Sequence, residues 1–170
     1  QKNLNLKVKF RERFRPFAPS ILKEDLSTWF NMTVVSPYML LVSEINSKKK
    51  IEMSQDQNNL FGIDKLNIKR SEIPAVTHVD YSARVQTVDG NNNKKYYDLI
   101  SKFKEKTGCP VIVNTSFNVR GEPIVNTPTD AFNCFMGTEL DYLVIGDCIL
   151  DKLKQNPKLK KDYTKEFELD

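Results

Sequence analysis

The chain has 170 residues, enough for one domain with a hydrophobic core, and 39% of them are apolar. Its net charge of +4 is too mild to indicate a nucleic-acid-binding protein by itself. There is no run of about 20 apolar residues, and the segment Gln1 to Phe17 is too charged for a signal peptide, so we expect no membrane association. Three widely spaced cysteines and one histidine predict no metal site and favour a reducing cytoplasm.

The first segment with a clear pattern is Leu6 to Arg15, in which apolar and basic residues alternate. This alternation predicts a strand with one apolar face and one row of cations, formed by Lys7, Lys9, Arg11, Arg13 and Arg15. Such a row fits a solvated edge strand, because edges commonly carry charges. It also fits an anion site, the interpretation we favour, because Arg binds phosphate bidentately.

Two prolines fix an extended path after Arg15, and Ser20 then predicts the N-cap of a short helix over Ile21 to Phe30. Met39 to Ile45 is apolar and predicts a buried strand. Asn46 to Arg70 has little periodicity and many polar residues. We expect a surface insertion or mobile loop there, partly disordered.

Ala75 to Val88 predicts a second alternating strand. Its polar face would carry five chemically different groups, namely His78, Asp80, Ser82, Arg84 and Gln86. Mixed donors and acceptors fit a ligand-lined cleft better than a solvent-facing surface. Lys94 to Lys106 then predicts an amphipathic helix, with Gly108 at its C-terminal cap.

The most informative stretch is Val111 to Val125, which begins as a buried strand. If the strand pattern continues, Asn114, Ser116 and Asn118 point to one side, next to Arg120. This predicts a strand end that faces a ligand. The alternative is a capped loop whose Asn and Ser side chains bond to their own backbone, and the stretch alone does not separate the two.

Thr127, Pro128 and Asp130 predict a capping box for a helix that runs to Gly137. A buried strand over Leu140 to Ile145 and a turn at Gly146-Asp147 lead into a last short strand. Strands that alternate with helices predict an α/β (α+β) domain over 1–150, with an insertion over 46–70. Residues 151–170 form a polar C-terminal tail, expected to be frayed or helical.

No common phosphate loop and no catalytic triad is present. What remains is three segments with polar strand faces, which would form one cleft with many cations and few carboxylates if the strands are neighbours. Such a cleft suits a polyanion and has little machinery for proton transfer. It would serve phosphoryl or nucleotidyl transfer, which depends on positioning and on stabilising charged oxygens.

Six segments form a further pattern, namely Lys9–Glu12, Phe14–Pro19, Pro74–Asp80, Ser82–Val88, Asn114–Val125 and Gly146-Asp147. In this order they resemble segments of the O-carbamoyltransferases of nodulation-factor, tobramycin and cephamycin biosynthesis. The resemblance covers about residues 5–150 and concerns only the C-terminal, YrdC-like part of those enzymes. It implies a twisted mixed sheet with helices packed on it. Two departures are Tyr81, where the family often has Gly, and the long segment 46–70.

The resemblance implies that this domain uses carbamoyl phosphate and ATP, with Mg²⁺, to make carbamoyl adenylate. It also implies an N-terminal actin-like domain that binds iron or another divalent metal and passes the carbamoyl group to an acceptor hydroxyl. That domain would belong to the same protein or to a separate subunit, so we expect this chain to be a fragment or a subunit. Small-molecule substrates are expected, and nucleic acid is not.

By the same resemblance, Lys9 and Arg15 should bind the phosphates, Arg84 a phosphate or the carbamoyl group, and Ser116 the α-phosphate region. Further pocket contacts are expected from Asn114, Asn118, Arg13, His78 and Arg120. The rival hypothesis is a basic nucleotide- or RNA-binding module without catalysis of its own.

Overall fold

The computed structural model describes residues 1–163 and 166–167. The chain forms two compact units. The central unit is Pro16–Thr115, and the terminal unit combines Gln1–Arg15 with Ser116–Asp170. A mixed sheet with helices confirms the predicted α/β class. The predicted boundaries of a domain over 1–150 and a tail over 151–170 stay predictions.

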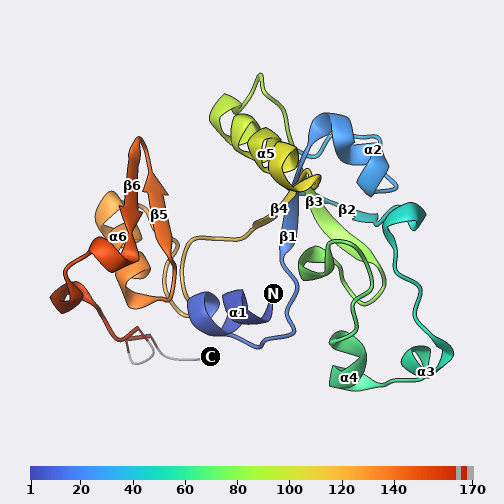
Figure 1. Ribbon diagram of the computed structural model, residues 1–170, viewed down its shortest axis with the longest axis horizontal. Helices are drawn as coiled ribbons and strands as arrows, with labels where there is room; N and C mark the ends of the chain where they lie inside the picture. The colour runs from blue at the N-terminus through green and yellow to red at the C-terminus, as the bar shows by residue number, and fades with distance from the viewer. Residues whose placement is uncertain (164–165, 168–170) are drawn as a thin grey trace. The chain divides into compact units, whose positions relative to one another are not determined.

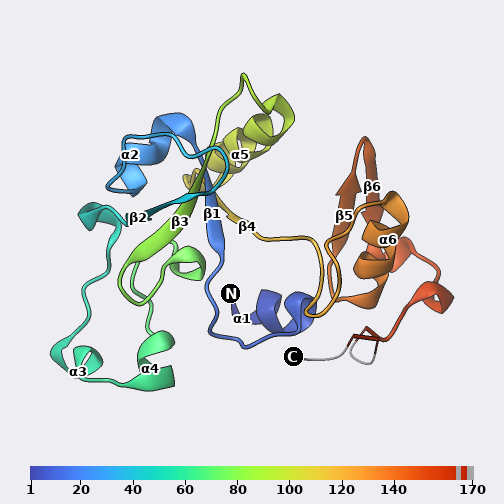
Figure 2. The same cartoon turned by 180° about the vertical axis from the view of Figure 1, so that it is seen from behind.

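The central unit is built on a four-stranded mixed sheet in the order β2-β3-β1-β4 (Figure 1). The strands are β1 (Ala18–Leu22), β2 (Leu41–Glu44), β3 (Ser82–Val88) and β4 (Val111–Asn114). β1 is parallel to β3, with Ser20 opposite Gln86, and antiparallel to β4. Figure 2 shows the same order from behind, with β2 and β4 at the two edges.

Helix α5 (Lys94–Thr107) packs against this sheet, as predicted from its periodicity. Its fully buried Ile100 joins Leu22 and Val88 in one apolar cluster. The helix ends where Gly108 adopts a left-handed conformation with φ 74°, which confirms the predicted glycine cap.

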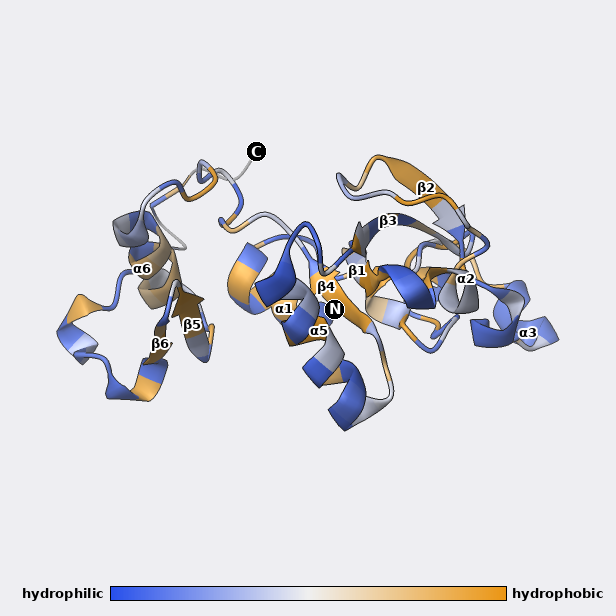
Figure 3. Ribbon diagram, turned by 90° about the horizontal axis from the view of Figure 1, so that it is seen from above, coloured by the Kyte–Doolittle hydropathy of each residue, from blue (hydrophilic) through white to orange (hydrophobic). Residues whose placement is uncertain are grey.

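Two other predictions for the central unit are wrong. The segment expected to be a helix over Ile21 to Phe30 begins as β1, and only short turns follow, η2 (Lys23–Asp25) and α2 (Leu26–Trp29). The reason is tertiary, because a central strand buries both faces and so accepts the continuous apolar pair Ile21-Leu22. The strand expected over Met39 to Ile45 exists as β2, but its predicted burial is wrong, because β2 is an edge strand and Val42 is 65% exposed. Figure 3 shows the apolar colour along this edge.

The second alternating strand is shorter than predicted. Residues Pro74–Val76 form a 3₁₀ turn (η4), and Tyr81 has a positive φ of 62° before β3 begins at Ser82. His78 and Asp80 therefore do not share the strand face of Arg84. Within 46–70 the chain forms three short turns, η3 (Ser47–Lys49), α3 (Gln55–Asn58) and α4 (Gly62–Leu66), with mostly exposed side chains.

The terminal unit begins with a helical segment, not with the predicted strand over Leu6 to Arg15. α1 (Lys2–Leu4) continues into a π-helical turn, η1 (Asn5–Lys9), which ends at Phe10 in a left-handed conformation. The physical reason is a long-range set of bonds centred on one residue. The Asn5 side chain is fully buried and donates to the carbonyls of Arg13 and Arg15, and this closes the segment into a loop.

The rest of the terminal unit follows local signals in the sequence. α6 (Pro128–Gly137) starts with the predicted capping box between Thr127 and Asp130. The hairpin of β5 (Tyr142–Ile145) and β6 (Cys148–Asp151) packs on α6 through Leu143, although the other β5 side chains are not buried. Two 3₁₀ turns follow, η5 (Lys152–Lys154) and η6 (Pro157–Leu159). None of the helices in the described residues is long and apolar enough to cross a membrane.

Candidate functional site

The terminal unit contains a buried lysine held by neutral oxygens. Lys9 is the last residue of η1 and is only 5% exposed. Its Nζ donates to the Ser116 carbonyl at 2.9 Å, Ser116 Oγ at 3.3 Å, the Asn118 carbonyl at 2.6 Å and Asn118 Oδ1 at 2.8 Å. The structure therefore brings together Lys9, Ser116 and Asn118, three of the predicted site residues. We call this group the Lys9 knot.

The Lys9 ammonium makes no ion pair within the part of the chain that the structure describes. Burial, followed by the nearby Arg11 guanidinium, lowers the pKa of Lys9 to about 8. A buried charge without a counter-ion costs free energy, and hydrogen bonds from neutral groups offset only part of it. Charges kept at such a cost are typical of functional sites.

The loop around Asn118 explains how these acceptors are fixed. Ser116 Oγ donates to Asn118 Oδ1 at 2.6 Å, and Asn118 Nδ2 donates to the Glu122 carbonyl at 2.7 Å. Glu122 Oε2 in turn accepts the Val119 amide at 2.8 Å. The strand ends at Asn114, so the predicted alternation through Asn118 is wrong. The loop bonds to itself, and its remaining oxygens converge on Lys9.

A surplus of positive charge surrounds the knot. Residues 9–15 and 116–122 carry five cations, Lys9, Arg11, Arg13, Arg15 and Arg120, against the two carboxylates Glu12 and Glu122. Arg15 and Arg120 lie on either side of Glu12, with N–O distances of 3.6 Å and 3.7 Å. The segments therefore hold a net charge of about +3, which favours an anionic ligand.

Two residues of this region were not predicted as site residues. Arg11 is half-buried, and its Nε donates to Asn5 Oδ1 at 2.7 Å. Asn5 also holds the backbone of Arg13 and Arg15 in place. Arg11 was visible only as one cation in a row of five. Nothing in the sequence pointed to Asn5 as a buried residue, because a single Asn beside charged residues usually lies on the surface.

The central unit holds the other predicted residues on a polar strand face. Gln86 Oε1 accepts Ser20 Oγ at 2.6 Å and Asn114 Nδ2 at 2.6 Å, and Gln86 Nε2 donates to the Pro37 carbonyl at 3.1 Å. Arg84 lies two residues before Gln86 on the same face of β3. It is exposed and makes no hydrogen bond or ion pair with any described residue.

A pocket of about 520 Å³ adjoins this face. Its lining includes Gln86, Lys23, Tyr38, Asn93 and Tyr96. His78 stays outside the face. It is exposed, and its backbone amide donates to the Ser82 carbonyl.

The predicted site residues therefore divide between the two units. The terminal unit holds six of them, Lys9, Arg13, Arg15, Ser116, Asn118 and Arg120. The central unit holds His78, Arg84 and Asn114. Because Leu6 to Arg15 is not a strand, the three neighbouring strand faces predicted from the sequence do not exist as such.

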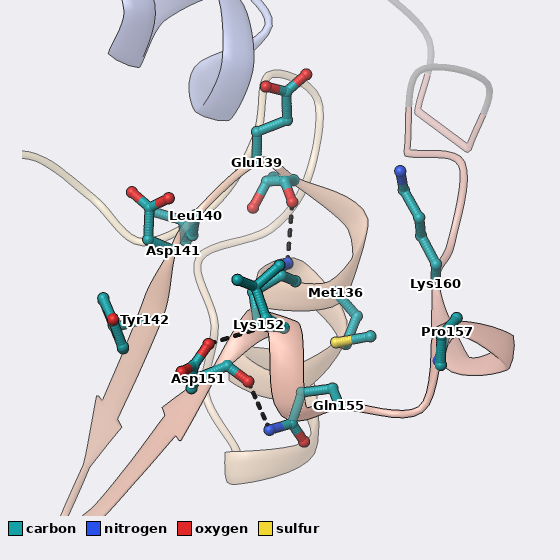
Figure 4. Close-up of a pocket in the computed structure, with 12 residues that line it drawn as sticks. Met136, Glu139, Leu140, Asp141, Tyr142, Asp151, Lys152, Gln155, Pro157 and Lys160 are labelled. Atoms are coloured by element: carbon teal, nitrogen blue, oxygen red, sulfur yellow. Dashed lines mark hydrogen bonds between the residues drawn. The ribbon is translucent and has the colours of Figure 1, made fainter.

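A second pocket in the terminal unit contains none of these residues. It measures about 570 Å³ and lies between the β5–β6 hairpin, the end of α6 and the two 3₁₀ turns (Figure 4). Lys152 Nζ donates to the carbonyls of Thr138, at 3.0 Å, and Phe135, and so caps α6. In the described residues no cluster of three or more His, Cys, Asp or Glu side chains is placed to hold a metal ion.

Comparison with known proteins supports one family. A protein of undescribed function from Synechocystis sp. is 52% identical over the whole chain, which covers 28% of that protein. Nodulation protein NolNO of Sinorhizobium fredii is 39% identical over 91% of the chain and 20% of its own length. The 3'-hydroxymethylcephem-O-carbamoyltransferase of Streptomyces clavuligerus is 33% identical over 82% of the chain and 23% of its own length.

The chain thus spans between 20% and 28% of the length of these relatives. The profile of the family described as Carbamoyltransferase C-terminus matches residues 1–152, which include the whole central unit, most of the terminal unit and all nine predicted site residues. The chain belongs to the family of carbamoyltransferase C-terminal domains.

Proposed function

We propose that this chain is the carbamoyl-adenylate-forming domain of an O-carbamoyltransferase. The observation that carries the proposal is the Lys9 knot with its surplus of cations, in a member of the carbamoyltransferase C-terminal family. The knot offers positive charge and hydrogen bonds to phosphate oxygens, and it lacks an evident general base. A domain with these properties suits nucleotidyl transfer, in which catalysis depends on positioning and charge stabilisation.

The proposed reaction has two steps on this domain. Water first cleaves carbamoyl phosphate into carbamate and inorganic phosphate. A carbamate oxygen then attacks the α-phosphorus of ATP, the bond to the β-phosphate oxygen breaks, and pyrophosphate leaves. Mg²⁺ would enter as the MgATP complex, as part of the substrate. The carbamoyl adenylate then passes its carbamoyl group to an acceptor hydroxyl and releases AMP.

Within the terminal unit, Lys9 would contact phosphate oxygens by exchanging one of its present acceptors. The contact to Ser116 Oγ is the longest of the four, at 3.3 Å, and is the one we expect to be replaced. Ser116 Oγ would keep its donation to Asn118 Oδ1 and so hold that acceptor in place beside Lys9. Arg11 and Arg15 would add charge around the same ligand.

Within the central unit, Arg84 would bind a phosphate or the carbamoyl group. It is exposed and unpaired among the described residues, so binding an anion breaks no existing contact. The bonds of Gln86 to Ser20 and Asn114 keep this face of the sheet rigid beside it. Because Gln86 carries a neutral amide and not a carboxylate, it does not compensate the charge of Arg84.

The names of the relatives support an acceptor hydroxyl, because one of them is called an O-carbamoyltransferase of a hydroxymethyl group. The matched region also makes up only 28% and 20% of the length of two of these relatives. We therefore propose that acceptor binding and the second transfer require a further domain, in the same protein or in a partner subunit, and that the two work in the cytoplasm.

The test is isotope exchange between pyrophosphate and ATP, measured on the 170-residue chain with and without carbamoyl phosphate. We expect exchange that depends on carbamoyl phosphate. Lys9→Met and Arg84→Met should each lower its rate at least about tenfold, the usual range for charge-stabilising groups. Lys154→Met is the matched control, because Lys154 is exposed and has no side-chain partner among the described residues.

Two results would contradict the proposal. One is the absence of binding of both ATP and carbamoyl phosphate. The other is unchanged exchange in both Lys9→Met and Arg84→Met, which would move the site elsewhere. Binding of single-stranded RNA with a steep salt dependence, and without competition by ATP, would support the rival binding module instead.

A further inference from the structure

The C-terminal segment of the terminal unit lies against the loop that holds Lys9. The family profile ends at residue 152, so residues 153–163, which we call the C-terminal strap, lie beyond it. The strap carries the two turns η5 and η6 and reaches Tyr163, which is only 4% exposed. A tyrosine buried this deeply in a polar terminal segment needs an explanation.

The strap is fixed at the end of helix α6 from two directions. Immediately before the strap, Lys152 Nζ donates to the Thr138 carbonyl at 3.0 Å (Figure 4). At its other end, the Tyr163 ring packs directly on Gly137, the last residue of α6. A Cβ at position 137 would lie 2.3 Å from Tyr163 Cγ, so this contact requires glycine.

Tyr163 also belongs to the apolar cluster beneath the Lys9 knot. Its buried neighbours there are Val119 and Cys134, and Phe10 and Phe117 pack against them. Phe10 directly follows Lys9, and Phe117 lies between the two residues that accept from its ammonium. The Tyr163 ring thus belongs to the same apolar cluster as both segments that form the Lys9 knot, the one that ends at Phe10 and the loop around Phe117.

The hydroxyl of Tyr163 makes the connection specific. It lies beside the carboxylate of Glu122. Burial, followed by the charge of that carboxylate, raises the pKa of Tyr163, so the phenol stays neutral. Glu122 Oε2 accepts the Val119 amide at 2.8 Å, and the Glu122 carbonyl accepts Asn118 Nδ2 at 2.7 Å. Asn118 then accepts from Lys9 through two oxygens.

We propose that Tyr163 is a positioning residue for the Lys9 knot, which it orders through Glu122 and Asn118. The strap would thereby set the fraction of molecules in which Lys9 is held ready for its anionic ligand. This inference deepens the proposed function and depends on it for the identity of the ligand. The contact chain itself is a property of the fold and can be tested without activity.

The first test measures Lys9 directly in the 170-residue chain. Competitive acetylation with trace acetic anhydride across pH 7–11, read by mass spectrometry, gives the reactivity and pKa of each lysine. In Tyr163→Phe the ring remains but the hydroxyl is lost, so we expect Lys9 to become about fivefold more reactive at pH 8, the shift that one ordinary hydrogen bond controls. Tyr142→Phe is the matched control, because Tyr142 lies in the same unit and is 62% exposed.

The second test uses the packing contact. Gly137→Ala should displace the Tyr163 ring and raise Lys9 reactivity at least as much as Tyr163→Phe does. In a Tyr163→Ala background the same Gly137→Ala change should have no further effect on Lys9, because the ring that it would clash with is gone. If Gly137→Ala acted only on helix α6, it would change the reactivity of Lys9 by the same amount in both backgrounds.

The outcomes separate this inference from the proposed function. If Tyr163→Phe and Gly137→Ala both leave the reactivity of Lys9 between pH 7 and pH 11 the same as in the control Tyr142→Phe, the positioning role is overturned. If they change it as expected, the role is supported, even where the unmodified chain binds no ATP and the proposed function fails. If ATP does bind, we expect Tyr163→Phe to weaken its affinity about fivefold as well.

Discussion

The two units gather polar side chains in opposite ways. In the terminal unit the charge of Lys9 is buried and its partners are neutral oxygens. In the central unit the buried part is a neutral set of bonds around Gln86, and the charge of Arg84 stays in solvent. A buried charge has a fixed position and costs stability, whereas an exposed charge costs nothing and has no fixed position. The comparison predicts that substitutions of Lys9 and of Arg84 change the free energy of unfolding by very different amounts.

Lys9→Met should have the largest effect on the free energy of unfolding. The substitution keeps most of the apolar stem but removes the charged donor to four oxygens, of which Asn118 Oδ1 still accepts from Ser116 Oγ. We expect a loss of about 2–3 kcal/mol, measured by urea denaturation at pH 7, because hydrogen bonds from a charged donor contribute more than neutral ones. Lys154→Met should change it by less than about 0.5 kcal/mol. A rise in stability for Lys9→Met would show that the buried charge costs more than its hydrogen bonds return.

Gln86→Leu is the corresponding change in the central unit. It removes a side chain that makes three hydrogen bonds, to Ser20, Asn114 and the Pro37 carbonyl. These partners are neutral and partly reach water, so we expect a smaller loss of about 1–2 kcal/mol. Urea denaturation of both variants under the same conditions gives the comparison. A loss larger than that of Lys9→Met would reverse the contrast between the two units.

The sequence predicted those parts of both units that depend on local chemistry. The capping box at Thr127 and Asp130 fixes the start of α6, and the glycine at 108 fixes the end of α5. Both signals act within one helical turn, so no tertiary information is needed to read them. Lys9, Ser116 and Asn118 were also singled out, by the residue pattern and by the family segments, but their contacts with one another were not predicted.

The parts that failed depend on partners far away in the chain. Residues 6–15 alternate as a strand would, but bonds from the buried Asn5 to residues 11–15 fold the segment into a turn. Ile21 and Leu22 were expected to begin a helix. They form part of β1 instead, because β1 lies between β3 and β4 in the sheet. Periodicity reports which side chains are apolar, and it does not report which backbone or side-chain groups will satisfy a buried amide.

A third prediction uses the pKa of Lys9 to test whether its charge is buried in solution. Its folded-state pKa of about 8 lies below the model-compound value of 10.5. Between these two pH values the unfolded chain keeps the proton and the folded chain loses it, so raising the pH favours the folded form. Below pH 8 both forms are protonated, and the cost of burying the charge is fully present.

The difference in unfolding free energy between the unmodified chain and Lys9→Met should therefore rise from pH 8 to pH 10.5. We expect an increase of at least about 1 kcal/mol, because a change of one in pKa corresponds to about 1.4 kcal/mol. Parallel urea titrations at pH 7, 8, 9 and 10 measure it, and other groups cancel in the difference. A difference that stays flat would mean that Lys9 titrates as an exposed lysine, and the contrast with Arg84 would disappear.

Arg84→Met should have the smallest effect on folding and so completes the comparison. Arg84 is exposed on β3, and its side chain has no partner among the described residues. Its removal leaves no buried group unpaired, so we expect a change below about 0.5 kcal/mol, equal to that of the exposed control Lys48→Met. If Arg84→Met nevertheless abolishes exchange, as proposed, the loss belongs to ligand binding alone. A large loss of stability would instead show that Arg84 holds the sheet together, and the central unit would then bury its charge as the terminal unit does.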